Sequence, residues 1–144
     1  MTAYDTDNIF AKILRGEIPC FNVYENDHVL AFLDIMPRAP GHTLVIPKAP
    51  ARNLLDITEA DFGHVARATR LIARVAMPAL KADGIMIAQF SEAASGQEVY
   101  HLHMHVIPRF TGVALLPPAT VKADMAALKD QAAMLKAALE GARD

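Results

Sequence analysis

The sequence predicts an α+β fold, with a mainly antiparallel sheet of five strands, a short N-terminal helix, a long central helix and an additional C-terminal helix. Five short segments rich in β-branched and aromatic residues are bounded by polar residues, glycines or prolines, as strands usually are. Other segments repeat apolar residues every three or four positions, as helices do. The resulting order of helix, hairpin, strand, helix, two strands and helix is typical of the α+β class.

The first part of the chain predicts a short helix followed by three strands. Asp7 can cap a helix over residues 8–15, and Gly16 can end it because glycine readily adopts the backbone conformation found after a helix. Polar residues at 25–28 suit the turn of a hairpin, and two prolines and a glycine at 36–41 suit a loop. The three expected strands cover residues 21–24, 29–35 and 42–46.

The second part predicts a long helix, two strands and a last helix. Residues 58–61 resemble a capping box, and Pro78 is expected to bend or end the helix that they open. Strands are expected at 85–90 and around the histidines at 101–105. A last helix from about residue 121 carries an apolar stripe, which must cover either the chain's own sheet or a partner. The inner face of the long helix would hold Phe62, Val65, Thr69, Ile72 and Ala76.

The whole chain, residues 1–144, is expected to form one domain, because its length suits a single core and no linker divides it. The hydrophobic content of 53% excludes disorder, and a net charge of −2 without a basic run argues against binding to long nucleic acids. The polar, acidic N-terminus does not resemble a signal peptide, and no apolar run reaches transmembrane length. With a single cysteine, Cys20, these features predict a cytoplasmic protein without disulfides or membrane contact.

The segment His101-Leu102-His103-Met104-His105 carries more chemistry than any other part of the chain. Successive side chains of a β-strand point to opposite faces, so the three histidines would share one face while Leu102 and Met104 turn to the core. A helix would spread the same imidazoles around its axis. The pattern therefore predicts a strand that gathers three imidazoles on one surface.

Residue types alone leave three interpretations of this surface open. Imidazoles bind transition metals, although the chain has no Cys-x-x-Cys or His-Glu-x-x-His to complete a zinc site. Three purely structural histidines would stabilise a fold little, because imidazoles repel when charged and need partners when neutral. A neutral imidazole whose Nδ1–H is held by a carbonyl can instead attack phosphorus through Nε2. Backbone groups for phosphate could come from Gly96, Gln97 and Glu98 at the entrance of the strand.

The histidine segment, followed by Val106 and Ile107, resembles the signature of the histidine triad (HIT) family. The likeness covers about residues 7–109 and implies the HIT-like version of the five-stranded fold, with a C-terminal helical extension at about 120–141. It also implies a homodimer. Further segments similar to the Hint-like bacterial branch are residues 8–13 (Asn-Ile-Phe-Ala-Lys-Ile), 16–19 (Gly-Glu-Ile-Pro), 31–35 (Ala-Phe-Leu-Asp-Ile), 40–48 (Pro-Gly-His-Thr-Leu-Val-Ile-Pro-Lys) and the pair 96–97 (Gly-Gln).

The resemblance implies a role for each matched residue. His103 would attack the α-phosphorus of a nucleotide, and His105 would assist departure of the leaving group. The carbonyl of His101 would orient the attacking ring, and His42 would complete the histidine cluster. Asp34 would accept both ribose hydroxyls, since a carboxylate offers paired acceptors. Further contacts with the nucleotide would come from Ile9, Phe10, Ile13, Phe32, Ile35, Ser91, Gln97, Glu98 and Val99.

Three features depart from the family pattern. Phe90 and Ser91 stand where relatives often carry Asn or Gln, so contacts between this loop and the leaving group would differ. Glu98 stands where Ser or Thr often binds phosphate, which leaves its backbone N–H for that task. Asn8 and Ala11 replace two cysteines that hold structural zinc in some bacterial members. No metal and no cofactor are therefore expected.

The implied activity is hydrolysis of nucleoside 5′-phosphoramidates, or of related nucleoside phosphoryl compounds, to a nucleoside monophosphate through a covalent nucleotidyl-histidine. The substrate would be a purine nucleotide of the AMP type. Two alternatives stay open: hydrolysis of dinucleoside polyphosphates of the Ap3A or Ap4A type, and a nucleotide-binding regulatory or partner protein with little turnover. A zinc site on the histidines is a third.

Overall fold

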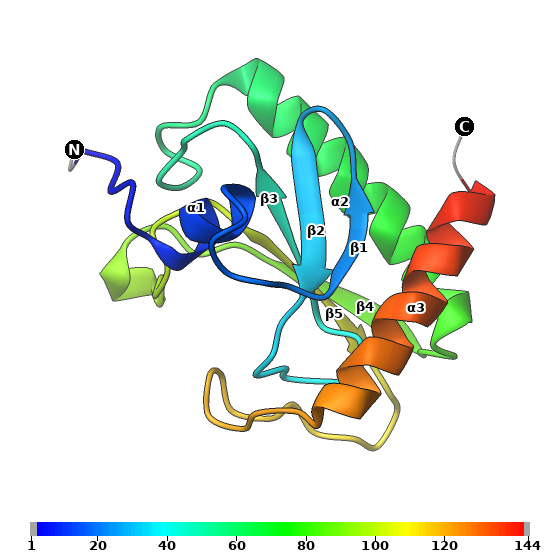
Figure 1. Cartoon of the computed structure of the whole chain (residues 1–144). Helices are drawn as coiled ribbons and strands as arrows, with labels where there is room; N and C mark the ends of the chain where they lie inside the picture. The colour runs from blue at the N-terminus through cyan, green and yellow to red at the C-terminus, as the bar shows by residue number, and fades with distance from the viewer. Residues whose placement is uncertain (1–2, 143–144) are drawn as a thin grey trace.

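The computed structural model of the chain describes residues 3–142, and these form the five-stranded α+β fold predicted from the sequence (Figure 1). The strands lie in the order β1-β2-β3-β5-β4, and every neighbouring pair is antiparallel. The elements are α1 (Ile9–Leu14), β1 (Asn22–Glu25), β2 (Val29–Leu33), β3 (Thr43–Pro47), α2 (Glu59–Ala79), β4 (Gly84–Ala88), the short 3-10 helix η1 (Ala93–Ser95), β5 (Met104–Arg109) and α3 (Met125–Ala142).

The central strands are buried on both faces, and alternate residues of β2 belong to two different cores. Val29 and Ala31 pack beneath α2 and α3 in the larger core. Leu30 and Phe32 point to the opposite face and pack with Phe10 of α1 in a smaller core. Figure 1 shows α2 behind the sheet and α1 in front of it. The period-two alternation of the strand therefore supplies side chains to both layers.

The long helix α2 begins as the capping-box pattern predicts. Thr58 is its N-cap residue, and the Thr58 hydroxyl accepts the N–H of Asp61 at 3.1 Å. The helix ends at Ala79, so Pro78 occupies its last turn. Phe62 is only half-buried, although it was expected on the inner face. The buried residues of the helix are Val65, Ala68, Thr69, Ile72 and Ala76.

The C-terminal helix α3 covers the chain's own core. Leu128 and Leu135 of this helix lie in the same buried cluster as Ile72 of α2. The helix begins at Met125 rather than near residue 121, and Val121 is 46% exposed. Among residues 3–142, no helix is both long and apolar enough to cross a membrane.

The prediction that all three histidines of the triad share one strand was wrong, because β5 begins at Met104 and carries only His105. Upstream of the strand, the N–H of Leu102 donates to the carbonyl of Ala51 at 2.9 Å. Ala51 lies past the end of β3. The chain before Met104 therefore bonds to a loop instead of continuing the ladder with β3.

Some boundaries also differ by a few residues. Both β2 and β4 end earlier than expected, because their last predicted residues belong to the loops that follow. The N-cap of α1 is Asn8 rather than Asp7, since the Asn8 side chain accepts the N–H of Ala11 at 2.9 Å. Gly16 follows the helix with a φ of +77° and donates its N–H to the carbonyl of Ile13, as the predicted helix end requires.

Candidate active site

A pocket of about 520 Å³ opens on the face of the sheet that carries α1. Residues from α1, β2, β3, β5 and the loop after η1 meet in its wall, which combines apolar side chains with imidazoles and carboxylates. The structure thereby brings together segments that are far apart in the sequence. The predicted site residues in the wall are Ile9, Phe10, Ile13, Phe32, Asp34, Ile35, His42, Glu98, Val99, His103 and His105.

Three predicted site residues lie outside the pocket wall. His101 is completely buried, and Ser91 bonds through its hydroxyl to a neighbouring glutamine side chain. Gln97 is also buried: its Oε1 accepts the N–H of Glu92 at 2.7 Å, and its Nε2 donates to the carbonyl of Arg52 at 2.8 Å. The Ser91 and Gln97 side chains therefore shape the loop and do not face the pocket.

The ring of His103 is oriented by a carbonyl and by an aromatic ring. Its Nδ1 lies 2.7 Å from the carbonyl oxygen of His101. Because a carbonyl can only accept, Nδ1 carries the proton and Nε2 keeps an unshared lone pair. The ring of Phe10 meets the imidazole edge-on, with the centroids 4.9 Å apart. This tautomer is the one that a nucleophilic imidazole requires.

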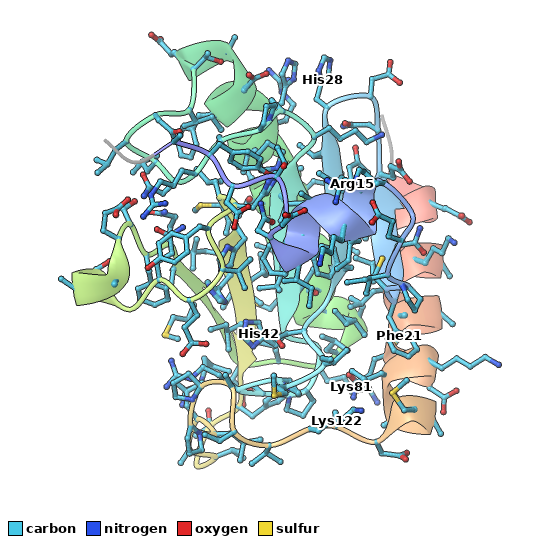
Figure 2. The ribbon with its side chains drawn as sticks, turned by 60° about the vertical axis from the view of Figure 1, so that its left-hand side comes forward. Arg15, Phe21, His28, His42, Lys81 and Lys122 are labelled. Atoms are coloured by element: carbon cyan, nitrogen blue, oxygen red, sulfur yellow. The ribbon has the colours of Figure 1, made fainter. Side chains whose placement is uncertain are left out.

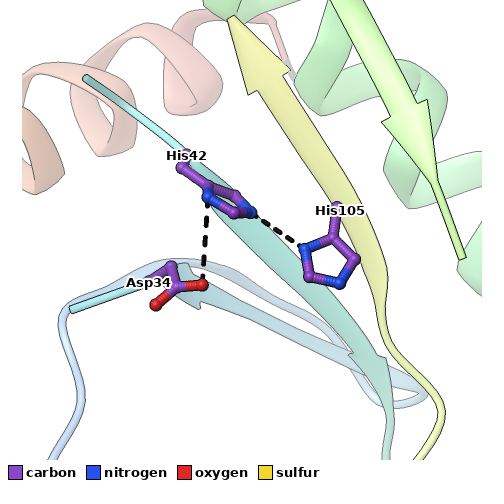
Figure 3. Close-up of side chains that lie close together, drawn as sticks. All are labelled: Asp34, His42 and His105. Atoms are coloured by element: carbon purple, nitrogen blue, oxygen red, sulfur yellow. Dashed lines mark hydrogen bonds and ion pairs between the residues drawn. The ribbon is translucent and has the colours of Figure 1, made fainter. Parts of the chain in front are cut away.

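Hydrogen bonds also fix the tautomers of His42 and His105. The backbone N–H of Arg38 donates to His42 Nδ1 at 3.0 Å, so the proton of neutral His42 lies on Nε2. That Nε2 lies 2.9 Å from Nδ1 of His105, which must accept (Figure 3). His105 therefore carries its own proton on Nε2. The centroids of the His105 and His103 rings are 4.9 Å apart, so the ring that offers a donor lies next to the ring that offers a lone pair.

Asp34 lies close to this pair, and a dashed line in Figure 3 joins its carboxylate to the ring of His42. Its Oδ2 is 3.8 Å from His42 Nδ1, and that nitrogen already accepts the N–H of Arg38 and has no proton to share. The other carboxylate oxygen accepts the N–H of Met36 at 2.9 Å. Burial raises the pKa of Asp34, although the hydrogen bond from Met36 opposes the rise.

His101 is clamped between the N-terminal segment and the end of β3. Its Nε2 donates to the carbonyl of Pro47 at 2.8 Å, and its Nδ1 accepts from the hydroxyl of Tyr4 at 2.5 Å. The clamp fixes the ring, and with it the carbonyl that holds His103. No sequence motif pointed to Tyr4, because 97 positions separate it from His101.

Burial keeps the four imidazoles of the cluster neutral near pH 7. It lowers the pKa of His42 and of His101 to about 4, and that of His105 to about 3. Burial also lowers the pKa of His103, although the hydrogen bond to the His101 carbonyl opposes this decrease. The positive charge of Arg38 adds to the lowering at His42 and His105. Neutral rings agree with the hydrogen bonds, because a neutral imidazole has one nitrogen that donates and one that accepts.

The loop before the triad is held by a charged network. Arg52 donates through Nε and Nη2 to the carboxylate of Glu92 at 2.8 and 2.9 Å, and its guanidinium lies 4.2 Å from the centroid of the Tyr100 ring. Gly96 follows η1 with a φ of +107°, a conformation that would strain any residue with a side chain. Gly96 and Glu98 both border the pocket. A fixed frame therefore presents this part of the backbone to the site.

Several pocket residues were not expected from the sequence. Arg38 borders the pocket from the loop before β3, and Pro118 and Ala119 come from the segment between β5 and α3. Phe90, a departure from the family pattern, also lines the pocket and packs on His105 with ring centroids 5.4 Å apart. Proximity to the Pro-Gly-His segment could have drawn attention to Arg38. Pro118 and Ala119 lie outside every recognised motif.

The two remaining histidines lie outside the pocket wall. His28 and His64 stack on each other with ring centroids 3.6 Å apart and an interplanar angle of 5°. In Figure 2, His28 projects at one end of the molecule, whereas His42 lies near its middle. Substitution of either of these two histidines therefore changes an imidazole without altering the pocket wall.

Within the described part of the chain, one group of side chains could hold a metal ion: Asp34, His42 and His105. One ligand atom from each lies within 4.8 Å of the others. Both ring nitrogens of His42 and Nδ1 of His105 are already engaged in hydrogen bonds. An ion bound by all three residues would have to displace one of those bonds, so the arrangement suits imidazoles that hold protons better than metal ligands.

Comparison with known proteins decides the family. The profile of the HIT domain matches residues 15–112. The chain belongs to the HIT family. An uncharacterized 13.2 kDa HIT-like protein of Azospirillum brasilense is 46% identical over 121 residues, which are 81% of this chain and 95% of that protein.

Solved structures of HIT proteins have the same fold. A HIT-like protein of Bartonella henselae, described as involved in cell-cycle regulation and as holding an unknown ligand, is 51% identical with a TM-score of 0.90. The match covers 95% of this chain and 99% of that one, so it extends beyond the HIT profile towards α3. A hypothetical histidine triad nucleotide-binding protein of Sulfolobus tokodaii is 28% identical with a TM-score of 0.83, over 92% and 91% of the two chains.

Proposed function

We propose that this HIT protein hydrolyses nucleoside 5′-phosphoramidates, or related nucleoside phosphoryl compounds, through a nucleotidyl intermediate on His103. Membership of the HIT family supports a nucleotide-binding or nucleotide-hydrolysing protein, and the relative from Sulfolobus tokodaii is described as nucleotide-binding. The observation that carries the finer proposal is the pair of fixed tautomers. His103 offers the lone pair of Nε2, and His105 offers an N–H donor beside it.

The rest of the pocket suits a nucleoside. Ile9, Phe10 and Phe32 provide apolar surface against which a base can pack. Asp34 borders the same pocket with a carboxylate that can accept both hydroxyls of a ribose. The likeness to the family predicts a purine base, as in AMP.

The reaction would proceed in two displacements at phosphorus. In the first, Nε2 of His103 forms a bond to the α-phosphorus while the bond to the leaving group breaks, and the leaving atom takes the electron pair. The N–H of His105 would stabilise the charge that develops on that atom. In the second, water attacks phosphorus and the histidine regains its electron pair. Overall, the oxygen of water ends on the nucleoside monophosphate and the leaving amine gains a proton.

The test is release of AMP from an adenosine 5′-phosphoramidate. His103→Ala should lower kcat/KM by at least about 1,000-fold, because the nucleophile is lost. His64→Ala is the matched control, since this histidine lies outside the pocket, and it should turn over like the wild type. Mass spectrometry of quenched wild-type protein should find AMP on the peptide that contains His103. Equal turnover by His103→Ala would exclude this nucleophile, and tight AMP binding without turnover would favour a regulatory nucleotide-binding protein.

We also propose that two copies pair through β4 and α2. β4 is an edge strand of the sheet, and its outer side pairs with no strand among residues 3–142. Ile87 of β4 is 43% exposed and Met77 of α2 is 40% exposed, so apolar side chains are available for a symmetric contact. Sedimentation velocity should give the mass of two chains, and a single-chain mass would contradict the proposal.

A further inference from the structure

We infer that Arg38 binds the leaving group and makes this site prefer leaving groups that carry an anion, either a carboxylate or a phosphate. The inference rests on the proposed function and specifies part of its substrate class. Neither the HIT signature nor the implied roles of the triad assign a function to this residue.

Arg38 lies beside the histidines that would face the leaving group. Its backbone N–H bonds to His42, which in turn bonds to His105. Arg38 borders the pocket, and its charge lowers the pKa of both histidines, in addition to the larger effect of burial. The N–H of His105 is the donor that would meet the leaving atom, so substituents on that atom would extend along the part of the wall that Arg38 shares with His42 and His105.

The guanidinium is anchored at one edge and keeps further donors. Its Nε donates to the carbonyl of Leu116 at 3.0 Å, and the N–H of Leu116 donates back to the Arg38 carbonyl at 2.9 Å. Within residues 3–142, Nη1 and Nη2 make no other hydrogen bond. An arginine held in this way presents a pre-oriented pair of donors, which matches a carboxylate or a phosphate.

The segment that anchors Arg38 also forms part of the pocket wall. Pro118 and Ala119 of the 110–124 segment line the pocket, and the N–H of Ala123 donates to the carbonyl of Ile35 at 2.9 Å. In Figure 1 this segment, drawn in yellow and orange, runs beneath the sheet from β5 to α3. It extends past residue 112, where the match to the HIT profile ends. This side of the pocket is therefore set by residues outside the shared pattern of the family.

The charges in the pocket wall favour an anion next to Arg38. Asp34 and Glu98 contribute carboxylates, and among the described residues of the wall Arg38 is the one lysine or arginine. Both carboxylates repel an anionic leaving group, so such a group needs the guanidinium for compensation. A neutral leaving group would leave the free donors of Arg38 to solvent.

The test compares substrates whose leaving groups carry an anion with related substrates whose leaving groups carry none. The adenosine 5′-phosphoramidates of glycine and glycinamide form a carboxylate pair, and those of phosphoethanolamine and ethanolamine form a phosphate pair. In at least one pair, wild-type kcat/KM should be roughly tenfold or more higher for the anion, as expected for a charge-assisted hydrogen bond. The pair that shows the preference identifies the anion. Arg38→Gln should bring the ratio close to one, and Arg38→Lys should restore part of it.

Arg109→Gln is the matched control, because it removes the same charge and another bond to the same segment. Arg109 donates through Nη2 to the carbonyl of Val113 at 3.1 Å and does not line the pocket. A ratio near one for both pairs in the wild type, an unchanged ratio in Arg38→Gln, or equal loss in Arg109→Gln would overturn the inference.

Turnover of the neutral substrates tests the proposed function separately. If these substrates are not hydrolysed, the same pairs can be compared by equilibrium binding to His103→Ala, with and without Arg38→Gln. A preference for the anion that disappears with Arg38 would still support the inference. Equal affinities for the two members of both pairs would overturn it.

Discussion

The two faces of the sheet are built from the same strands but differ in what covers them. On one face, α2 and α3 close over the strands and bury Ile72, Leu128, Leu135 and Leu139 almost completely. On the other face, α1 spans only six residues, and the uncovered area forms the pocket. The packed face therefore contributes most of the apolar burial, whereas the open face keeps room for a ligand.

The difference between the two faces also explains why each histidine of the site is held in one tautomer. In the described part of the chain, no buried side-chain nitrogen or oxygen lacks a hydrogen-bond partner. On the open face this requirement fixes each imidazole in one tautomer, because every ring has to match a particular donor or acceptor. The arrangement of protons at the site thus follows from satisfying buried polar groups, a constraint that the apolar core of the other face lacks.

The largest expected effect separates stability from activity. Leu135→Ala should lower the free energy of unfolding by about 2–5 kcal/mol, because Leu135 is completely buried and its loss leaves a cavity. Activity per folded molecule should stay the same, since no residue of α3 lines the pocket. Urea unfolding and active-site titration measure the two quantities. Met134→Ala is the control on the same helix, 48% exposed, with an expected change below about 0.5 kcal/mol. A large loss of kcat in folded Leu135→Ala would show that the two faces are coupled.

A smaller effect is expected from the residue that positions the triad. Tyr4→Phe removes the hydroxyl that donates to His101 and leaves the ring. The free energy of unfolding should fall by about 1 kcal/mol, and kcat should fall roughly tenfold at nearly constant KM, because the carbonyl that orients His103 is held less firmly. Tyr100→Phe is the control, since the ring that stacks with Arg52 is retained. Lost stability with unchanged kcat would assign Tyr4 a structural role alone.

The smallest change is expected in the response to pH. Burial lowers the pKa of His42 to about 4 and that of His105 to about 3, and it also lowers the pKa of His103. These rings are neutral above their folded pKa values, so kcat/KM should be nearly constant between pH 8 and pH 6, roughly, and should fall only as the pH approaches the lowered values. A steady-state pH profile checks this. A decline centred near the ordinary histidine value of about 6.5 would contradict a neutral, buried cluster.

Much of the fold and of the site was predictable from local patterns. The helix caps at Thr58 and Gly16 and the five strands depend on residues close together in sequence. Most predicted pocket residues do meet in one wall. The exceptions have a physical cause: Gln97 and Ser91 lie in the right loop, but their side chains bond within it. The alternation of histidines with apolar residues could not show that the triad begins before β5. The start of β5 also depends on where β3, its partner strand, stops pairing with it.

The sequence by itself determined the α+β class, the HIT signature and the set of imidazoles, because periodicity and short motifs are local properties of the chain. Only the tertiary structure decided which nitrogen of each imidazole carries the proton, since the deciding partners are a distant tyrosine, two carbonyls and a backbone N–H. It also decided that α3 covers its own core and that Arg38 meets the 110–124 segment beside the histidines. Such contacts join residues far apart in the chain, and no local pattern encodes them.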